Sequence, residues 1–139
     1  MAARIFTPTE ANELLEELRP LAEEMVERRR ALAEAAESRA NLAGRIAGNG
    51  GGLEPQELVD VHEALDREAN AVARLVEEIQ AYGVLVKDLD RGLLDFPARR
   101  GGEEVLLCWH VGEEEIGFWH GTEEGFAGRK PLPADWDEG

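Results

Sequence analysis

The sequence predicts an α+β protein: a long antiparallel helical hairpin followed by a small antiparallel β-sheet of about four strands. Residues 1–81 are rich in Ala, Glu and Arg, and their apolar side chains recur every three or four positions, the period of a helix. Residues 82–132 instead alternate apolar and polar side chains, which is typical of strands. At 139 residues we expect a single domain, 1–139, that ends in a loop-like tail, 133–139, with little order.

The first helix begins at a capping box. Thr7 can accept a hydrogen bond from a free backbone N–H, Glu10 can reach back, and Pro8 suits the first helical position. A heptad-like seam follows and is interrupted by two charged residues, Arg28 and Arg39. Its apolar members are Leu14, Leu18, Leu21, Met25, Leu32, Ala35, Leu42 and Ile46.

Pro20 lies inside this helical pattern. Because proline lacks the N–H of a helical hydrogen bond and its ring clashes with the preceding turn, the sequence predicts a kink or break near Leu18–Arg19. We therefore expect a short helix, 8–19, and a long one, 20–47.

A glycine-rich segment, 48–52, ends the second helix, and Pro55 suits the start of a third, 55–81. The seam of this helix is interrupted at Glu68. The two long helices are similar in length, so we expect them to pair as an antiparallel hairpin. Each also carries a flank of small residues that two helices alone cannot cover, which favours a homodimer.

Four short apolar runs are the predicted strands: 83–89, 93–98, 104–111 and 115–121. The first two are joined by a turn with Gly92 in the left-handed conformation. Pairing Leu89 with Leu93 sets Lys87 opposite Asp95, as an opposite-charge pair across the two strands.

The second hairpin is predicted to turn through 112–115, with Val111 opposite Ile116. This register places His120 on the apolar face of the sheet. On the other face it places Cys108, His110, Gly117 and Trp119.

Three strings of the sheet region resemble an uncharacterised bacterial family, one of the domains of unknown function. They are GVLVKDLDRGLLDFP at 83–97, LCWHVGE at 107–113 and WHGTEEGFAGRKPL at 119–132. The opening FTPTEAN before a long helix is also similar to the family. The resemblance covers nearly the whole chain, and it implies a small bacterial protein with no established activity and no functional residues to carry over.

The candidate binding residues lie in the sheet and its loops: Lys87, Asp95, Cys108, His110, Trp119, His120 and Arg129. Cys and His are zinc ligands, but the spacing C-x-H followed by a single His lacks a second Cys pair. His120 is also predicted to face away from Cys108. We therefore expect no metal and no cofactor.

Arg129 lies in a glycine-flanked loop, 125–130, within an acidic stretch of the chain. A buried guanidinium without a partner is costly, so Arg129 must have an acidic partner, a ligand or a cluster of carbonyl groups. We expect its role to be structural.

The formal net charge of −15 opposes binding to nucleic acid or to an anionic membrane surface. A single Cys excludes an intramolecular disulfide. The first residues contain no apolar signal core, and no run approaches the length of a membrane span. We expect a cytoplasmic protein.

Two functions remain open. The first is a non-enzymatic interaction protein that binds an unknown protein partner through the hairpin or a sheet edge. The alternative is a small-molecule or metal-dependent enzyme whose site lies in the sheet and loop region. Convergence of the candidate polar residues in one cleft favours the enzyme, and their scatter over both faces favours the interaction protein.

Overall fold

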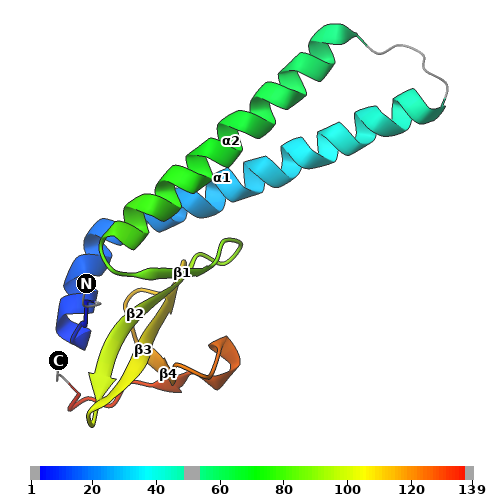
Figure 1. Ribbon diagram of the computed structural model, residues 1–139. Helices are drawn as coiled ribbons and strands as arrows, with labels where there is room; N and C mark the ends of the chain where they lie inside the picture. The colour runs from blue at the N-terminus through cyan, green and yellow to red at the C-terminus, as the bar shows by residue number, and fades with distance from the viewer. Residues whose placement is uncertain (1–3, 49–53, 137–139) are drawn as a thin grey trace.

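The computed structural model describes residues 4–48 and 54–136 and contains two long helices and a five-stranded antiparallel sheet. The predicted α+β architecture is confirmed, with one strand more than expected. Helices α1 (Pro8–Gly48) and α2 (Pro55–Ala81) form an antiparallel hairpin whose far end extends well beyond the sheet (Figure 1). Most of the predicted glycine turn, 49–52, lies outside the described residues.

The capping box at the start of α1 is confirmed. The Thr7 N–H donates to Glu10 Oε1 at 2.9 Å, and the Glu10 N–H donates to Thr7 Oγ1 at 3.0 Å. The predicted division into helices 8–19 and 20–47 is wrong, because α1 continues through Pro20. The N-terminal part of the helix, drawn in blue in Figure 1, bends relative to the rest. A proline inside a continuous helix removes one hydrogen bond and bends the axis without ending the helix.

The two helices pack most closely near the sheet. Met25 of α1 is buried there with Val72, Leu75 and Ile79 of α2. The charged interruptions of the two seams meet each other, since Arg28 Nη1 lies 3.1 Å from Glu68 Oε1. Towards the far end, Leu42 is buried but Ile46 is half exposed.

The strands follow one another across the sheet in sequence order. A short 3₁₀ turn, η1 (Phe126–Gly128), lies between the last two. The strands are β1 (Leu85–Asp88), β2 (Leu93–Arg100), β3 (Glu103–His110), β4 (Phe118–Gly121) and β5 (Lys130–Pro131).

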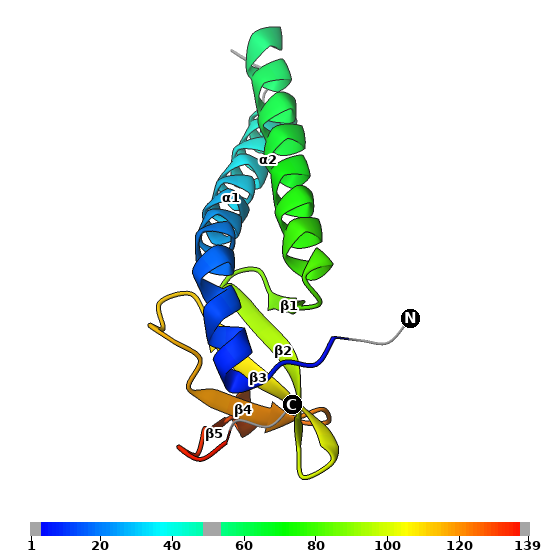
Figure 2. The ribbon, with the colours of Figure 1, turned by 90° about the vertical axis from the view of Figure 1, so that its left-hand side faces the viewer.

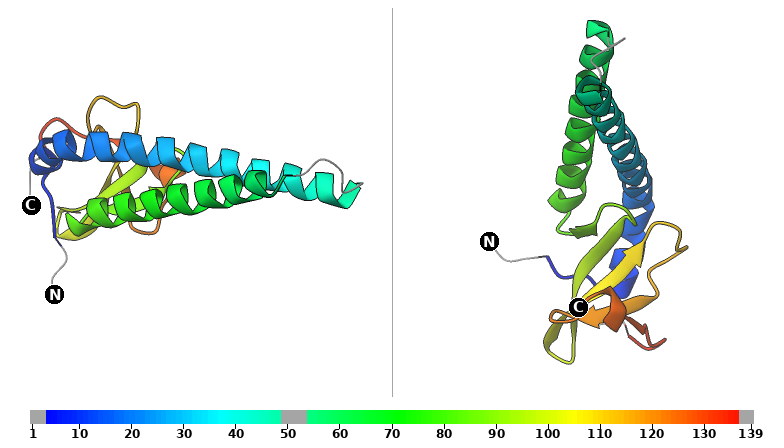
Figure 3. Two further views of the ribbon diagram at one scale, coloured as in Figure 1. Left: turned by 90° about the horizontal axis from the view of Figure 1, so that it is seen from above. Right: turned by 90° about the vertical axis from the view of Figure 1, so that its right-hand side faces the viewer.

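Both faces of the sheet are covered. The start of α1 packs on one face and closes the main core, while the hairpin rises away from one end of the sheet (Figures 2 and 3). Segment 122–130 lies over the opposite face. The main core includes Phe6, Leu15, Leu18, Met25, Leu94, Phe96, Leu107, Trp109 and Ile116.

The first hairpin differs from its predicted register. Val86 pairs with Leu94, two residues from the predicted partner Phe96, so the apolar side chains keep their face. The predicted pairing of Lys87 with Asp95 is wrong, because Lys87 lies in a bulge between the paired residues Val86 and Asp88. Gly92 has the left-handed conformation expected of it, with φ of +66°.

The second hairpin is shifted by one residue. Leu106 pairs with His120 and Cys108 with Phe118, so the predicted faces of β4 are exchanged. The cause lies outside the hairpin. Asn12 of α1 accepts the Ile116 N–H at 2.8 Å, so Ile116 enters the core from a loop and β4 begins only at Phe118.

The chain after Pro133 is not the loose tail that the sequence predicts, as far as the structure describes it. Trp136 is buried, and its ring meets the Trp119 ring edge to face, with centroids 5.5 Å apart. Through this contact Trp136 covers one edge of the main core next to β4.

Candidate functional site

Three buried side chains converge on the sheet face opposite α1. They are Asp95 from β2, Cys108 from β3 and His120 from β4. Asp95 and Cys108 are direct cross-strand partners, and the observed β4 register brings His120 to the same face. One donor atom from each residue lies within 4.8 Å of the other two. The prediction that His120 faces away from Cys108 is therefore wrong.

The imidazole of His120 is held by hydrogen bonds at both nitrogens. Nδ1 lies 2.8 Å from the Gly121 carbonyl oxygen, and Nε2 lies 3.2 Å from Asp95 Oδ1. A carbonyl oxygen only accepts, so Nδ1 carries a proton. Nε2 and Asp95 Oδ1 therefore share one further proton between them.

Burial dominates the protonation of the other two groups. It raises the pKa of the Asp95 carboxyl, while the nearby His120 and Lys87 act in the opposite direction. It also raises the pKa of the Cys108 thiol to about 11, and the Asp95 carboxylate adds to this effect. Near neutral pH the cluster therefore holds a protonated thiol beside an Asp–His pair.

The cluster borders a cavity of about 260 Å³. Asp95 and His120 form part of its wall, and the segment after β4 closes it from the other side. Lys87 reaches the cavity from the bulge in β1, which is a common use of bulges near functional sites. The lining residues are Lys87, Leu93, Asp95, Leu106, His120, Thr122, Glu124, Gly125 and Phe126.

Arg129 contacts the backbone of the cluster next to this cavity. Its Nη2 donates to the Cys108 carbonyl oxygen at 3.2 Å and to Glu113 Oε1 at 2.9 Å. The guanidinium lies over the rings of Phe118 and Phe126, at 4.0 Å and 4.6 Å from their centroids. Glu113 is the acidic partner that the sequence requires.

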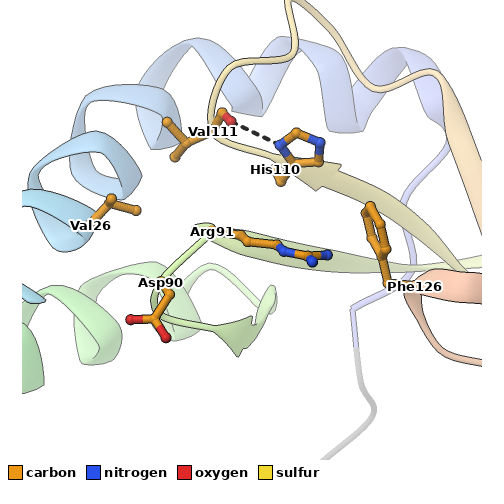
Figure 4. A pocket seen from close by; sticks show the side chains of 6 residues that line it. All are labelled: Val26, Asp90, Arg91, His110, Val111 and Phe126. Atoms are coloured by element: carbon orange, nitrogen blue, oxygen red, sulfur yellow. Dashed lines mark hydrogen bonds between the residues drawn. The ribbon is translucent and has the colours of Figure 1, made fainter.

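A second, open groove of about 540 Å³ adjoins the site (Figure 4). His110 lies in it, with Nδ1 2.8 Å from the Val111 carbonyl oxygen, and the Arg91 guanidinium lies over the Phe126 ring. Phe126 borders both the groove and the smaller cavity. His110 is therefore a neighbour of the cluster and supplies no donor atom to it.

The structure thus places most of the seven candidate residues on or beside one sheet face. Asp95, Cys108 and His120 meet, Lys87 borders the same cavity, and Arg129 and His110 lie next to it. Trp119 does not belong to the site, since it packs on the core face against Trp136. Sequence reasoning missed two polar residues of the wall, Thr122 and Glu124. One indication of their role in the sequence is that both lie within four residues after His120.

This geometry does not fit a Cys–His nucleophile. Such a pair needs a thiolate and an imidazole nitrogen free to take its proton. Here the thiol is held protonated by burial, and both ring nitrogens of His120 are already engaged. The donor types fit a metal better, because a thiolate, an imidazole and a carboxylate are the ligands of zinc.

Neither helix in the described ranges has an apolar stretch long enough to cross a membrane. Searches of curated proteins and of solved structures give no match to this chain. A family model described as "uncharacterized conserved protein (DUF2203)" matches residues 4–132. Since the match spans most of the 139 residues, the chain belongs to the DUF2203 family of uncharacterized conserved proteins.

Proposed function

We propose that the protein binds one divalent transition metal, zinc by preference, through Asp95, Cys108 and His120. The observation that carries the proposal is the convergence of three different donor groups within 4.8 Å on one buried face. Three protein ligands leave one position of a tetrahedral zinc free, as in catalytic zinc sites. In this chain a cavity lies beside Asp95 and His120, so a metal held by the cluster would be next to a space for a small ligand.

The surroundings of His120 support the same assignment. A histidine that binds a metal usually donates its other ring N–H to a carbonyl or carboxylate, which fixes the tautomer and the ring orientation. The contact between Nδ1 and the Gly121 carbonyl does this and turns Nε2 towards the other two donors. A bound metal would displace the thiol proton and the proton shared by Nε2 and Asp95.

This metal centre favours the enzyme hypothesis over the interaction hypothesis. The bound metal would polarise an oxygen of a small molecule in the cavity, or lower the pKa of a bound water. The chain's own residues would hold the metal, exclude bulk water and shape the cavity. We place the protein in the cytoplasm, where a lone thiol stays reduced and able to bind metal.

Metal titration of the purified, metal-free protein tests the proposal. We expect one zinc ion per chain by calorimetry and elemental analysis, and a thiolate-to-metal charge-transfer band when cobalt replaces zinc. Cys108→Ser and His120→Ala should each weaken binding by about tenfold or more. Circular dichroism verifies that both variants are folded.

His110→Ala is the matched control. His110 has the same contact from Nδ1 to its neighbouring carbonyl as His120, at the same 2.8 Å, but lies outside the cluster. It should bind zinc as the wild type does. The proposal fails if the wild type binds no stoichiometric metal, or if His110→Ala loses as much affinity as His120→Ala.

The exposed apolar residues of the distal hairpin support a second proposal, that this part contacts protein. Ile46, Leu58 and Val59 are 39–50 % exposed far from the sheet core. Such residues on a projecting hairpin fit the homodimer expected from the sequence. The two proposals concern different ends of the molecule and do not compete.

A further inference from the structure

Two exposed polar groups on the wall of the small cavity, the Lys87 ammonium and the Thr122 hydroxyl, are accessible to a ligand. Within the ranges 4–48 and 54–136, neither the Lys87 ammonium nor the Thr122 hydroxyl forms a hydrogen bond or an ion pair. Lys87 has one electrostatic contact, with the Asp95 carboxyl. A cation and a hydroxyl that border the same cavity are suited to an anionic ligand with oxygen atoms.

The backbone around Lys87 shows how its side chain reaches the cavity. In a regular strand Lys87 would continue the ladder between Val86 and Asp88. The bulge instead leaves it outside the ladder, and Lys87 borders the same cavity as Asp95 and His120. The sequence contains only two lysines, and the other, Lys130, is already paired with Glu124 at 2.7 Å.

We propose that the cavity binds a small carboxylate- or phosphate-bearing molecule, with one oxygen on the metal and its negative charge facing Lys87. This inference rests on the proposed metal centre, whose ligands Asp95 and His120 border the cavity. Three features then act on the same ligand: the metal binds an oxygen, Lys87 offsets the charge, and Thr122 can donate a hydrogen bond. The volume of about 260 Å³ limits the ligand to a small molecule.

The proposal explains how an acidic protein can select an anion. With a net charge of −15, the molecule as a whole repels anions. Recognition therefore needs local positive charge, which the metal and Lys87 would supply, while the Glu124 carboxylate of the same wall is offset by Lys130. A neutral molecule of the same shape lacks this attraction and should bind far less well.

The test uses the full-length protein loaded with cobalt, whose visible spectrum reports on the fourth ligand. Acetate and inorganic phosphate are titrated in separate arms, with acetamide as a neutral probe of nearly the same shape as acetate. We expect acetate, phosphate or both to shift the visible bands, and acetamide to leave them unchanged. The arm that responds more strongly identifies the ligand as carboxylate or phosphate.

Lys87→Met should weaken anion binding by about tenfold or more and leave cobalt binding unchanged. Arg99→Met is the control, because it removes an exposed cation of β2 that does not border the cavity, and it should behave as the wild type in both measurements. Equal binding of acetate and acetamide, no response to either anion, or normal anion binding by Lys87→Met overturns the inference while the metal site stands. If cobalt does not bind at all, the metal proposal fails and this inference fails with it.

Discussion

Arg129 joins three parts of the chain through one guanidinium group. It binds the backbone of β3 at Cys108, the carboxylate of Glu113 in the following loop, and the rings of Phe118 and Phe126. Its side chain is largely buried, so these contacts replace water. Loss of the side chain leaves Glu113 without its charged donor and opens a space beside the Asp95–Cys108–His120 cluster.

We predict that Arg129→Ala lowers the free energy of unfolding by about 1.5–3 kcal/mol, the range for a lost charged hydrogen bond. Urea denaturation measures this change. Arg99→Ala is the control, because Arg99 is exposed on β2 and should change stability by less than about 0.5 kcal/mol. Equal stability of the Arg129 variant and the wild type contradicts a structural role.

For single residues, the sequence predicted which side chains are candidates for a site but not which of them lie close together in the fold. Asp95, Cys108 and His120 were all candidates. Arg129 was expected to have an acidic partner, a ligand or a cluster of carbonyl groups, and the structure gives it the Glu113 carboxylate and one carbonyl oxygen. The sequence did not predict that the three residues converge, because a strand pattern reports alternation and not absolute register. A shift of one residue in β4 was enough to move His120 from one face to the other.

Among the elements, the helical hairpin contains a partly buried ion pair between its two helices. Arg28 and Glu68 interrupt otherwise apolar seams, and the side chain of Glu68 is only 8 % exposed. The Arg28 Nε is buried and has no hydrogen-bond partner among the described residues. Such pairs are costly to break but often contribute little net stability.

We expect Glu68→Ala to destabilise the protein by about 1–3 kcal/mol, because it leaves the Arg28 guanidinium partly buried and unpaired. The double variant Arg28→Leu with Glu68→Leu should recover most of this loss by extending the apolar seam. Thermal unfolding of the single and double variants gives the comparison. A double variant less stable than Glu68→Ala would show that the pair itself holds the helices together.

The elements differ in how far local sequence determines them. The capping box of α1 and the left-handed Gly92 follow from neighbouring residues, and both were predicted correctly. The start of β4 depends on Asn12, and the preceding loop is also held by Arg19, which donates to the carbonyl oxygens of Glu113 and Glu114. The two partners of each contact are about a hundred residues apart in the sequence, so the pattern of neighbouring residues could not predict these contacts.

For the whole molecule, the projecting hairpin predicts self-association. The exposed apolar residues Ile46, Leu58 and Val59 gather near its far end, and the small-residue flanks offer a surface for a second copy. Sedimentation equilibrium at micromolar concentration should show a species of twice the 15.3 kDa chain mass. Because the net charge is strongly negative, added salt should strengthen the dimer.

Two variants locate the interface. Val59→Glu places a charge on the distal hairpin and should give a monomer. Leu85→Glu is the control, since Leu85 is similarly exposed but lies on β1, next to the sheet core. A monomeric wild type, or equal disruption by both variants, contradicts the dimer through the hairpins.

The order of the strands also has a kinetic consequence. Each strand pairs with its neighbour in sequence, and α1 pairs with α2, so these contacts close short loops. The start of the chain is different, because Phe6 must reach Pro97 and Asn12 must reach Ile116. Folding therefore has one large loop to close, and its closure brings α1 onto the sheet and fixes the start of β4. We therefore expect the register of β4, and with it the partners of Cys108, to be fixed only when the two ends of this loop meet.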